Sequence, residues 1–223
     1  MDAHAAAPAP SYRLIPSKFP PIGLFDTVAT AADAEAVMEL AGWTNDRLVE
    51  ERLRRLPEAE WVYGRPNSSV VMATFLHAPP SGARFNGPDL GAWYAAASLR
   101  TAAIEVAHHL RREAVATGAP RLQRAFRTYT ASLAGDYLDL RGQQAARPEV
   151  YATGSYAASQ LLGESIRASG GAGIIYDSVR HAGGTNIVAH RPRNILQVTQ
   201  ADHWLLAVQA ASPRISLKRL SGA

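Results

Sequence analysis

The chain has 223 residues, of which 47% are hydrophobic and 19% are charged. This composition supplies the core of one substantial domain and excludes an intrinsically disordered protein. The chain has no cysteine, which excludes disulfides, thiolate metal sites and a cysteine nucleophile.

The net charge of +4 is carried almost entirely by arginine, because Lys18 and Lys218 are the only lysines. The guanidinium fork grips phosphate oxygens in pairs, so an arginine-rich protein suits phosphate recognition. The composition of a GC-rich genome is the other explanation for the same bias. The basic residues are scattered and form no dense stripe, which argues against direct nucleic-acid binding.

The N-terminal segment, MDAHAAAPAPSYR, has neither a basic region nor a long apolar region. This pattern predicts no secretory signal. No stretch of the sequence approaches the ~20 apolar residues that cross a membrane. We therefore expect a cytoplasmic protein that makes no membrane contact.

Residues 1–60 are predicted to form an N-terminal arm and two helices that pack on the core. Residues 1–22 are rich in Pro and Ala and are expected to extend over the surface. Amphipathic helices are predicted over 29–40 and 45–56. The charges of the second helix either form a solvated face or meet a partner.

Residues 61–223 are predicted to form the main domain, which belongs to the α+β class. The apolar run 69–76 is either a buried strand or a short buried helix, and residues 99–115 form a helix capped by Ser98. The other predicted elements are a helix over 156–167 and strands over 93–96, 126–133, 137–140, 173–178, 186–190, 195–199 and 204–209. Strands and helices do not alternate regularly, and the chain has neither a Rossmann fingerprint nor a P-loop.

The most informative stretch is 82–105, which combines an arginine, an aromatic ring and a carboxylate. Arg84 lies in a loop beside Gly82, and glycine lets a backbone approach a ligand closely. Arg84 either binds the pyrophosphate or ribose of a dinucleotide or ties down a turn. Tyr94 ends a short strand that leads into the next helix, so its ring either stacks on a nicotinamide or is an ordinary core aromatic.

Glu105 lies in an alanine-rich helix, at the margin of the apolar stripe. Breaking a nicotinamide–ribose bond builds positive charge on the sugar, and a fixed carboxylate stabilises that charge. The second interpretation of Glu105 is an exposed helix charge that pairs with His108, His109 or Arg112.

Ser178 follows a predicted buried strand and precedes Arg180. No nucleophile elbow surrounds it, so it is either a ligand-binding hydroxyl near a phosphate, supported by Arg180, or a plain strand-end serine. No metal site is predicted. Adjacent His108 and His109 point about 100° apart on a helix, and no acidic cluster accompanies them.

Several segments together resemble the RES family, the Arg-Glu-Ser toxins of bacterial type II toxin–antitoxin modules, which act on NAD. The matching segments are YGRP at 63–66, GARFN at 82–86, WYAA at 93–96, TAAIE at 101–105 and YDSVR at 176–180, followed by Gly183 and Gly184. The similarity extends from Trp61 to His190. The arginine, glutamate and serine of the family correspond to Arg84, Glu105 and Ser178, which the resemblance makes the catalytic residues.

The resemblance also implies which residues bind NAD. The set comprises Arg65, Arg84, Asn86, Tyr94, Ser178 and Arg180, with Arg65 as a second arginine candidate and Tyr94 as the aromatic residue. One departure from the family pattern is Ala83, where a second glycine is common. Alanine is tolerable there if its φ angle is below zero.

The implied fold is ADP-ribosyltransferase-like, with a split β-sheet core and helices around an NAD cleft. Proteins of this kind consume NAD as a substrate, without a metal, and release nicotinamide. We expect transfer of ADP-ribose to a cellular protein, which arrests growth, with residues 1–60 helping to recognise the acceptor. The alternative is an NAD glycohydrolase or phosphorylase that depletes NAD. The expected partner is an Xre-like, helix-turn-helix antitoxin that blocks the NAD cleft and carries the DNA binding.

Two rival classes stay open at this point. A binding module that holds a nucleotide in the same cleft without turnover would not need Glu105 for its function. A structural or regulatory protein would release no nicotinamide.

Overall fold

The structure is a computed structural model, and it describes residues 3–19, 23, 25–44 and 55–220. The helices are α1 (Ala31–Thr44), η1 (Glu58–Glu60), α3 (Ser68–Leu76), α4 (Leu99–Ala116), α5 (Ala157–Ala168) and η2 (Pro192–Asn194). The strands are β1 (His4–Ala6), β2 (Ser11–Pro16), β3 (Trp93–Ala96), β4 (Arg121–Leu133), β5 (Asp136–Asp139), β6 (Gly173–Asp177), β7 (Thr185–Ala189), β8 (Ile195–Gln209) and β9 (Ser212–Leu220). The predicted α+β class is confirmed.

In the described part of the chain, nine strands form one sheet in the order β1-β5-β6-β7-β3-β2-β4-β8-β9. The join between β3 and β2 is a single residue pair, Tyr12 with Ala96. By contrast, β2 pairs with β4 along its whole length, from Ser11 to Pro16. The sheet is therefore divided into two parts that meet at β3 and β2, as the split-sheet prediction expects.

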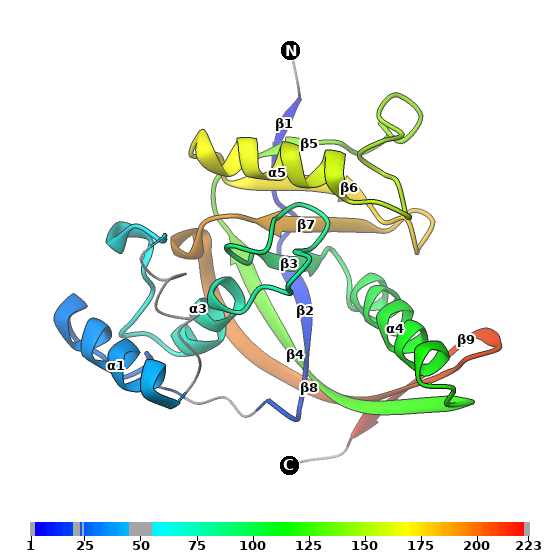
Figure 1. Cartoon of the computed structure of the whole chain (residues 1–223), viewed down its shortest axis with the longest axis horizontal. Coiled ribbons are helices and arrows are strands. Elements are labelled where there is room, and N and C mark those ends of the chain that lie inside the picture. The colour runs from blue at the N-terminus through cyan, green and yellow to red at the C-terminus, as the bar shows by residue number, and fades with distance from the viewer. Residues whose placement is uncertain (1–2, 20–22, 24, 45–54, 221–223) are drawn as a thin grey trace.

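The two longest strands, β4 and β8, run side by side across the molecule and curve strongly (Figure 1). Their register shifts after Arg127 and again after Thr130. Such irregularities increase the local twist and let a long strand bend. The sequence predicts separate strands over 195–199 and 204–209, but β8 is continuous, and Gln197 with a φ angle of 51° lies within it. Strand β9, which the sequence analysis does not predict, pairs with β8 at the sheet edge.

Helix α4 begins at the predicted cap. The Ser98 hydroxyl accepts a hydrogen bond from the Thr101 N–H at 3.2 Å, which satisfies one of the free donors of the first turn. The buried stripe of the helix consists of alanines and Leu110, and it packs against Leu14 of β2 and Phe126 of β4. Because these alanines are small, the helix backbone lies close to the sheet.

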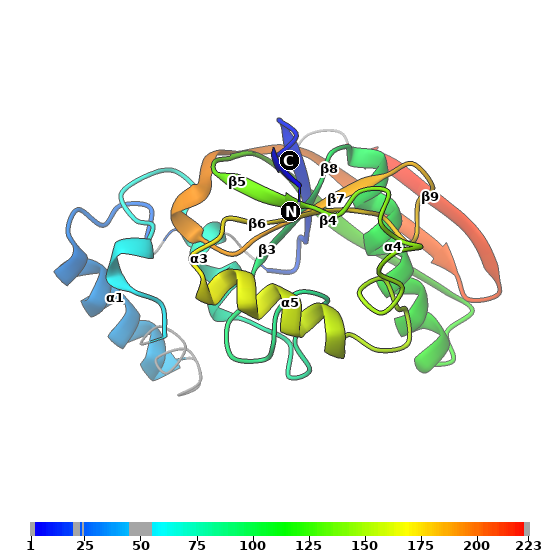
Figure 2. The same ribbon diagram turned by 90° about the horizontal axis from the view of Figure 1, so that it is seen from above.

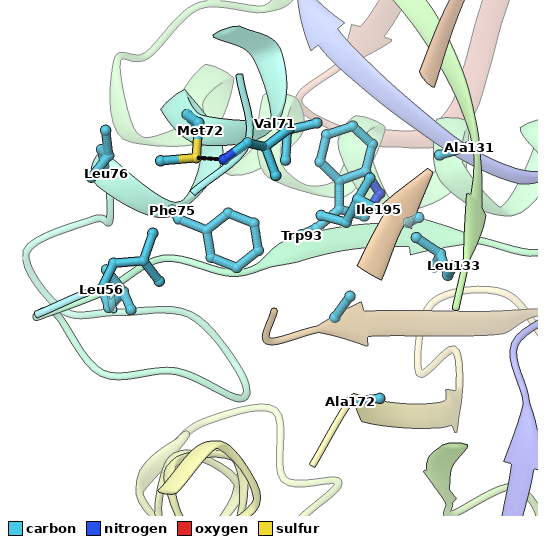
Figure 3. Close-up of a cluster of buried hydrophobic side chains, with 14 of the residues drawn as sticks. Leu56, Val71, Met72, Phe75, Leu76, Trp93, Ala131, Leu133, Ala172 and Ile195 are labelled. Carbon is cyan, nitrogen blue, oxygen red and sulfur yellow. Dashed lines mark hydrogen bonds between the residues drawn. The ribbon is translucent and has the colours of Figure 1, made fainter. Parts of the chain in front are cut away.

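The apolar run 69–76 is the helix α3, the second of its two predicted alternatives. A continuous apolar run of this length does not by itself distinguish a buried helix from a buried strand. Met72 and Phe75 of α3 belong to the same buried cluster as Trp93 of β3 and Ile195 of β8 (Figure 3). This cluster anchors β3 from the face opposite Tyr94.

The N-terminal segment is not an arm over the surface, and this prediction is wrong. Strand β1 lies at one edge of the sheet, and β2 is inserted between β3 and β4 at its centre (Figure 1). Ser11 and Leu14 are buried, and the Ser11 hydroxyl donates to the Ala131 carbonyl at 2.9 Å. The Pro- and Ala-rich composition concealed a short strand that is part of the core.

Helix α1 confirms the first of the two predicted N-terminal helices. It begins after Thr30, whose hydroxyl accepts from the Asp33 N–H at 3.1 Å. Of the second predicted helix, residues 45–54 lie outside the described residues. The division of the chain at residue 60 stays a prediction.

Helices α4 and α5 lie on the same side of the sheet (Figure 2). Leu162 and Ile166 of α5 pack against β6, next to Ile174 and Tyr176, whereas α4 covers the part formed by β2, β4 and β8. The two helices therefore flank the strands β3 and β2, where the two parts of the sheet meet. Within the described ranges, no helix has the length and apolar character needed to cross a membrane.

Candidate functional site

A cleft of about 500 Å³ opens over β2 and β3. One wall is the face of α4, and the opposite wall is residues 79–84 with Tyr156, which immediately precedes α5. Tyr176 of β6, Arg180 of the following loop and Asn186 of β7 complete the lining. Four of the predicted site residues line this cleft: Arg84, Tyr94, Glu105 and Arg180.

Glu105 is held by two side chains from the neighbouring strands. The Ser178 hydroxyl donates to Glu105 Oε1 at 2.6 Å, and the Asn186 amide donates to the same oxygen at 2.7 Å. No described residue donates to Oε2 or forms an ion pair with Glu105. The carboxylate is half-buried, so it is not the exposed, ion-paired helix charge of the second interpretation.

Ser178 is buried directly behind Glu105. Its oxygen accepts hydrogen bonds from the backbone N–H groups of Arg180 at 3.1 Å and His181 at 2.9 Å. These two acceptor contacts leave its single proton for Glu105, which makes the hydroxyl a fixed donor. The Ser178 N–H donates to Gly184 at 2.8 Å, which closes the loop after β6. Ser178 therefore orients the carboxylate and is not among the residues that line the cleft.

Tyr94 connects the floor of the cleft to the loop that carries Arg84. Its hydroxyl donates to Asn86 Oδ1 at 2.8 Å and accepts from the Phe85 N–H at 2.8 Å. Burial raises the pKa of Tyr94 well above its usual range, so the phenol keeps its proton. The ring lines the cleft while the hydroxyl fixes the loop, which makes Tyr94 more than an ordinary core aromatic.

Arg84 makes the anchoring contacts of its second interpretation and also lines the cleft, and its binding of a dinucleotide stays a prediction. It lines the cleft although it is buried, and its Nη1 donates to the carbonyls of Val150 at 3.1 Å and Ala152 at 3.0 Å. The guanidinium also lies over the Tyr156 ring, 4.7 Å from its centre, where a cation–π interaction stabilises it. Arg84 is therefore a fixed cation in the wall.

The backbone around Arg84 explains the sequence pattern there. Gly82 has a φ angle of +70°, and a Cβ at this position would lie 2.2 Å from the Asn86 carbonyl oxygen. Only glycine fits there. Ala83 is not among the residues with positive φ, as its tolerance requires.

Besides Ser178, two more predicted site residues lie outside the lining of the cleft. Asn86 is buried and supports Tyr94, and its amide donates to the carbonyls of Gly87 and Leu90. Arg65 lies near the start of β8, where its Nη2 donates to the Ile195 carbonyl at 3.0 Å. The structure therefore brings Asn86 to the edge of the site and leaves Arg65 apart from it.

Arg13 is a cleft residue that the sequence analysis missed. Its Nη1 donates to the Tyr94 carbonyl at 2.8 Å, and its guanidinium lies over the Trp93 ring at 5.0 Å. Burial lowers the pKa of Arg13 to about 10, so the side chain stays charged at neutral pH. No signal in the sequence pointed to it, because β2 was assigned to a surface arm.

Asn186 is a second missed residue, and here a signal existed. The strand TNIVA is apolar except at its start, and an asparagine in a buried strand requires hydrogen-bonding partners. Its residue pairing places it beside Ala96 of β3 and Tyr176 of β6. That position carries its amide to Glu105.

The cleft is electropositive. Among the described residues that line it, four are arginines and one is a carboxylate: Arg13, Arg84, Arg112, Arg180 and Glu105. The lining also includes His109, whose pKa is lowered by desolvation. Such a cleft favours an anionic ligand. Within the described ranges, no group of three His, Asp or Glu side chains could hold a metal ion.

The fold and the cleft define an α+β protein whose site is built around one carboxylate, with arginines and aromatic rings on its walls. A family model for the RES domain matches residues 52–209, well over half of the chain. The chain therefore belongs to the RES domain family, and the resemblance drawn from the sequence is confirmed. Strands β1, β2 and β9 lie outside the matched range, although β2 contributes Arg13 to the cleft.

A comparison with curated proteins gave no match. Among solved structures, the chain is similar to the crystal structure of the M. tuberculosis MbcT–MbcA toxin–antitoxin complex. The TM-score is 0.44, with 15% sequence identity, and the similarity covers 89% of this chain and 86% of that chain.

Proposed function

We propose that this RES-domain protein is the toxin of a bacterial toxin–antitoxin module that cleaves the nicotinamide–ribose bond of NAD. It then transfers ADP-ribose to a cellular protein and so arrests growth. The observation that carries this proposal is Glu105, whose Oε1 is fixed by Ser178 and Asn186 in an electropositive cleft.

The geometry of Glu105 supports this chemistry. With Oε1 occupied by two donors, Oε2 is the oxygen that binds a ribose hydroxyl and faces the charge that develops on the sugar. When the C–N bond breaks, its electron pair leaves with nicotinamide, and the ribose becomes oxocarbenium-like. A pre-oriented carboxylate stabilises that cation without reorganising. The nucleophile of the acceptor then attacks the anomeric carbon.

The surrounding residues receive matching roles. The ring of Tyr94 stacks on the nicotinamide. Arg84 binds the nicotinamide ribose, and Arg180 binds the phosphates. Asn86 supports this subsite through Tyr94, and Ser178 acts by holding Glu105. Arg65 contacts Ile195 outside the cleft, so we assign it no role in NAD binding.

We base our proposals for the partner and the acceptor on the same family membership. We propose an Xre-like, helix-turn-helix antitoxin that covers the NAD cleft, and we propose that the complex acts in the cytoplasm. Residues 1–60 are proposed to contribute to recognition of the protein acceptor. A glycohydrolase or phosphorylase would use the same Glu105 step with water or phosphate as the nucleophile.

The test is to incubate the purified chain with adenine-labelled NAD and a cell lysate, and to follow nicotinamide and the label together. We expect nicotinamide release with label on one protein band. Release with label only in small molecules would replace the transferase by a glycohydrolase or, if phosphate-dependent, a phosphorylase. Folded protein that releases no nicotinamide would contradict NAD cleavage and favour a nucleotide-binding module.

A further inference from the structure

Two arginines at the cleft form no ion pair with any described residue. Arg112 projects from α4 and Arg180 from the loop after β6, and both line the cleft. Their guanidinium groups form no hydrogen bond or ion pair with any residue that the structure describes. By contrast, Arg124 of β4 forms an ion pair with Glu113 of α4. A cleft that keeps two cations unpaired is suited to receive an anion.

The position of Arg112 on α4 relates it to the reacting carboxylate. Glu105, His109 and Arg112 follow each other at helical spacings of four and three residues, which place them on one face of the helix, and all three line the cleft. Seven residues of α-helix rise about 10.5 Å. Arg112 therefore lies further along the cleft than Glu105, the residue proposed to contact the ribose.

Arg180 reaches the same region from the other side. Its backbone N–H donates to Ser178 Oγ, the oxygen whose proton is donated to Glu105. The loop that carries Arg180 is thus tied to the carboxylate through one hydroxyl. Desolvation lowers the pKa of His108 and of His109, and the charges of Arg180 and Arg112 lower both further, in agreement with the placement of the two arginines around one stretch of α4.

The other two arginines of the cleft are already engaged. Arg84 donates to the carbonyls of Val150 and Ala152, and Arg13 donates to the Tyr94 carbonyl. Their guanidinium groups are fixed in the walls and offer fewer donors to a ligand. A pyrophosphate has several oxygens to satisfy and is bound best by guanidinium groups with all their donors free.

We propose that Arg112 and Arg180 form the pyrophosphate subsite of the cleft, one on each side of the dinucleotide. This inference rests on the proposed function, because it takes NAD as the ligand. In this arrangement the ribose lies at Glu105, and the pyrophosphate attached to it lies between the two arginines. Arg84 is then left to form the wall beside the nicotinamide ribose.

The test measures binding of ADP, which carries the pyrophosphate without the scissile bond, by calorimetry on the full chain. The variants are Arg112→Ala, Arg180→Ala and the double variant. Loss of charge-assisted hydrogen bonds predicts about 10- to 100-fold weaker binding for each single variant, and a greater loss for the double variant. The salt dependence of binding should also decrease. Arg100→Ala is the matched control, since Arg100 is exposed on the same helix and does not line the cleft.

A second measurement compares nicotinamide release from NAD and from nicotinamide riboside, which lacks the pyrophosphate. The double variant should lose at least about 10- to 100-fold more kcat/KM with NAD than with nicotinamide riboside. Equal losses for both substrates, or ADP binding equal to wild type in the double variant, would overturn the subsite. Thermal melting verifies that each variant folds, and the lysine replacements Arg112→Lys and Arg180→Lys should recover part of the affinity.

The two proposals fail in different ways. If the wild-type chain binds ADP through these arginines but releases no nicotinamide, the subsite holds and NAD cleavage is wrong. If the wild-type chain cleaves NAD and the double variant binds ADP normally, the enzyme holds and the subsite is wrong. A wild-type chain that binds no ADP would overturn the subsite directly.

Discussion

The wall that carries Glu105 and the wall that carries Arg84 face each other across the cleft, and they differ in how their functional side chains are fixed. Glu105 projects from a long helix and is held by side chains of Ser178 and Asn186, at the ends of two central strands. Arg84 lies in an irregular segment and is held by carbonyls of a second irregular segment, 150–152. The charge that must be oriented most accurately is thus placed on regular elements.

The wall that carries Arg84, here called the Arg84 wall, is held by several separate hydrogen bonds. Tyr94 of β3 holds it through Asn86. Two side chains of α5 add further contacts: Gln160 donates to the Ala83 carbonyl, and Glu164 accepts from the Gly87 N–H. These contacts couple the shape of the wall to the packing of α5. We expect the Glu105 wall to determine kcat, and the Arg84 wall to determine KM and stability.

The largest effect is expected from Glu105→Gln, which removes the charge and keeps the shape. Loss of one pre-oriented stabilising group predicts a kcat lower by about 10²- to 10³-fold, measured as nicotinamide release. The melting temperature should be close to that of wild type. The control is Glu113→Gln on the same helix, which removes a surface charge paired with Arg124. Full activity of Glu105→Gln would contradict the mechanism.

Tyr94→Phe tests the Arg84 wall. The change leaves the Asn86 Oδ1 and the Phe85 N–H without their partner, and unsatisfied buried groups cost about 1–3 kcal/mol each. We expect a free energy of unfolding lower by about 2 kcal/mol in urea titrations, with a raised KM for NAD and a smaller change in kcat. Tyr63→Phe is the matched control, and it should alter neither quantity. A Tyr94→Phe protein of wild-type stability would show that the hydroxyl does not hold the loop.

Asn186→Leu tests the Glu105 wall by removing one of its two fixed donors. The volume is nearly kept, and the hydrogen bond to Glu105 Oε1 is lost. We expect kcat to fall about tenfold, which is the equivalent of one hydrogen bond to a charged group, while KM changes little. If KM rises and kcat does not fall, Asn186 contacts the substrate and does not position Glu105.

The last prediction concerns the effect of pH on stability, with no direct effect on the site. Desolvation, with the charge of Arg167, lowers the pKa of buried His190 to about 3 in the folded chain. The unfolded chain, with an ordinary histidine pKa near 6.5, binds the proton more readily below that pH. Stability is therefore fully retained above pH ~6.5 and decreases as the pH falls towards 3, by at most about 1.4 kcal/mol per pH unit from this residue.

His190→Leu should reduce this acid sensitivity. The measurement is the difference in urea midpoint between pH 7 and pH 5, compared with wild type. His4→Gln, which changes an exposed histidine, should leave the difference as it is. An unchanged pH dependence in His190→Leu would assign the acid sensitivity to other groups.

The sequence was informative where one segment determines the geometry. The cap at Ser98 and the alanine stripe predict α4, and that helix carries Glu105 at the margin of the stripe, where it lines the cleft. The glycine at position 82 is required by a local φ angle. Such features depend on neighbours in the chain, and simple spacing rules describe them.

The residues that were missed depend on contacts between distant segments. Asn186 reaches Glu105 across 81 positions of sequence, and Arg13 reaches the Tyr94 carbonyl across 81 positions as well. A local pattern cannot predict which strand enters the centre of a sheet, and this is why β2 was taken for a surface arm. Arg65, by contrast, belonged to a matching motif and yet lies outside the cleft.

The insertion of β2 between β3 and β4 also has a consequence during synthesis. The ribosome releases the N-terminal strand first, but β2 finds its long partner only when residues 126–131 have emerged. The two donors to Glu105, Ser178 and Asn186, are made later still. Because domains form from the N-terminus as the chain grows, the nascent protein cannot assemble its cleft until most of the chain has been translated. A partner protein can therefore be made during that interval, before the first chain with a complete cleft leaves the ribosome.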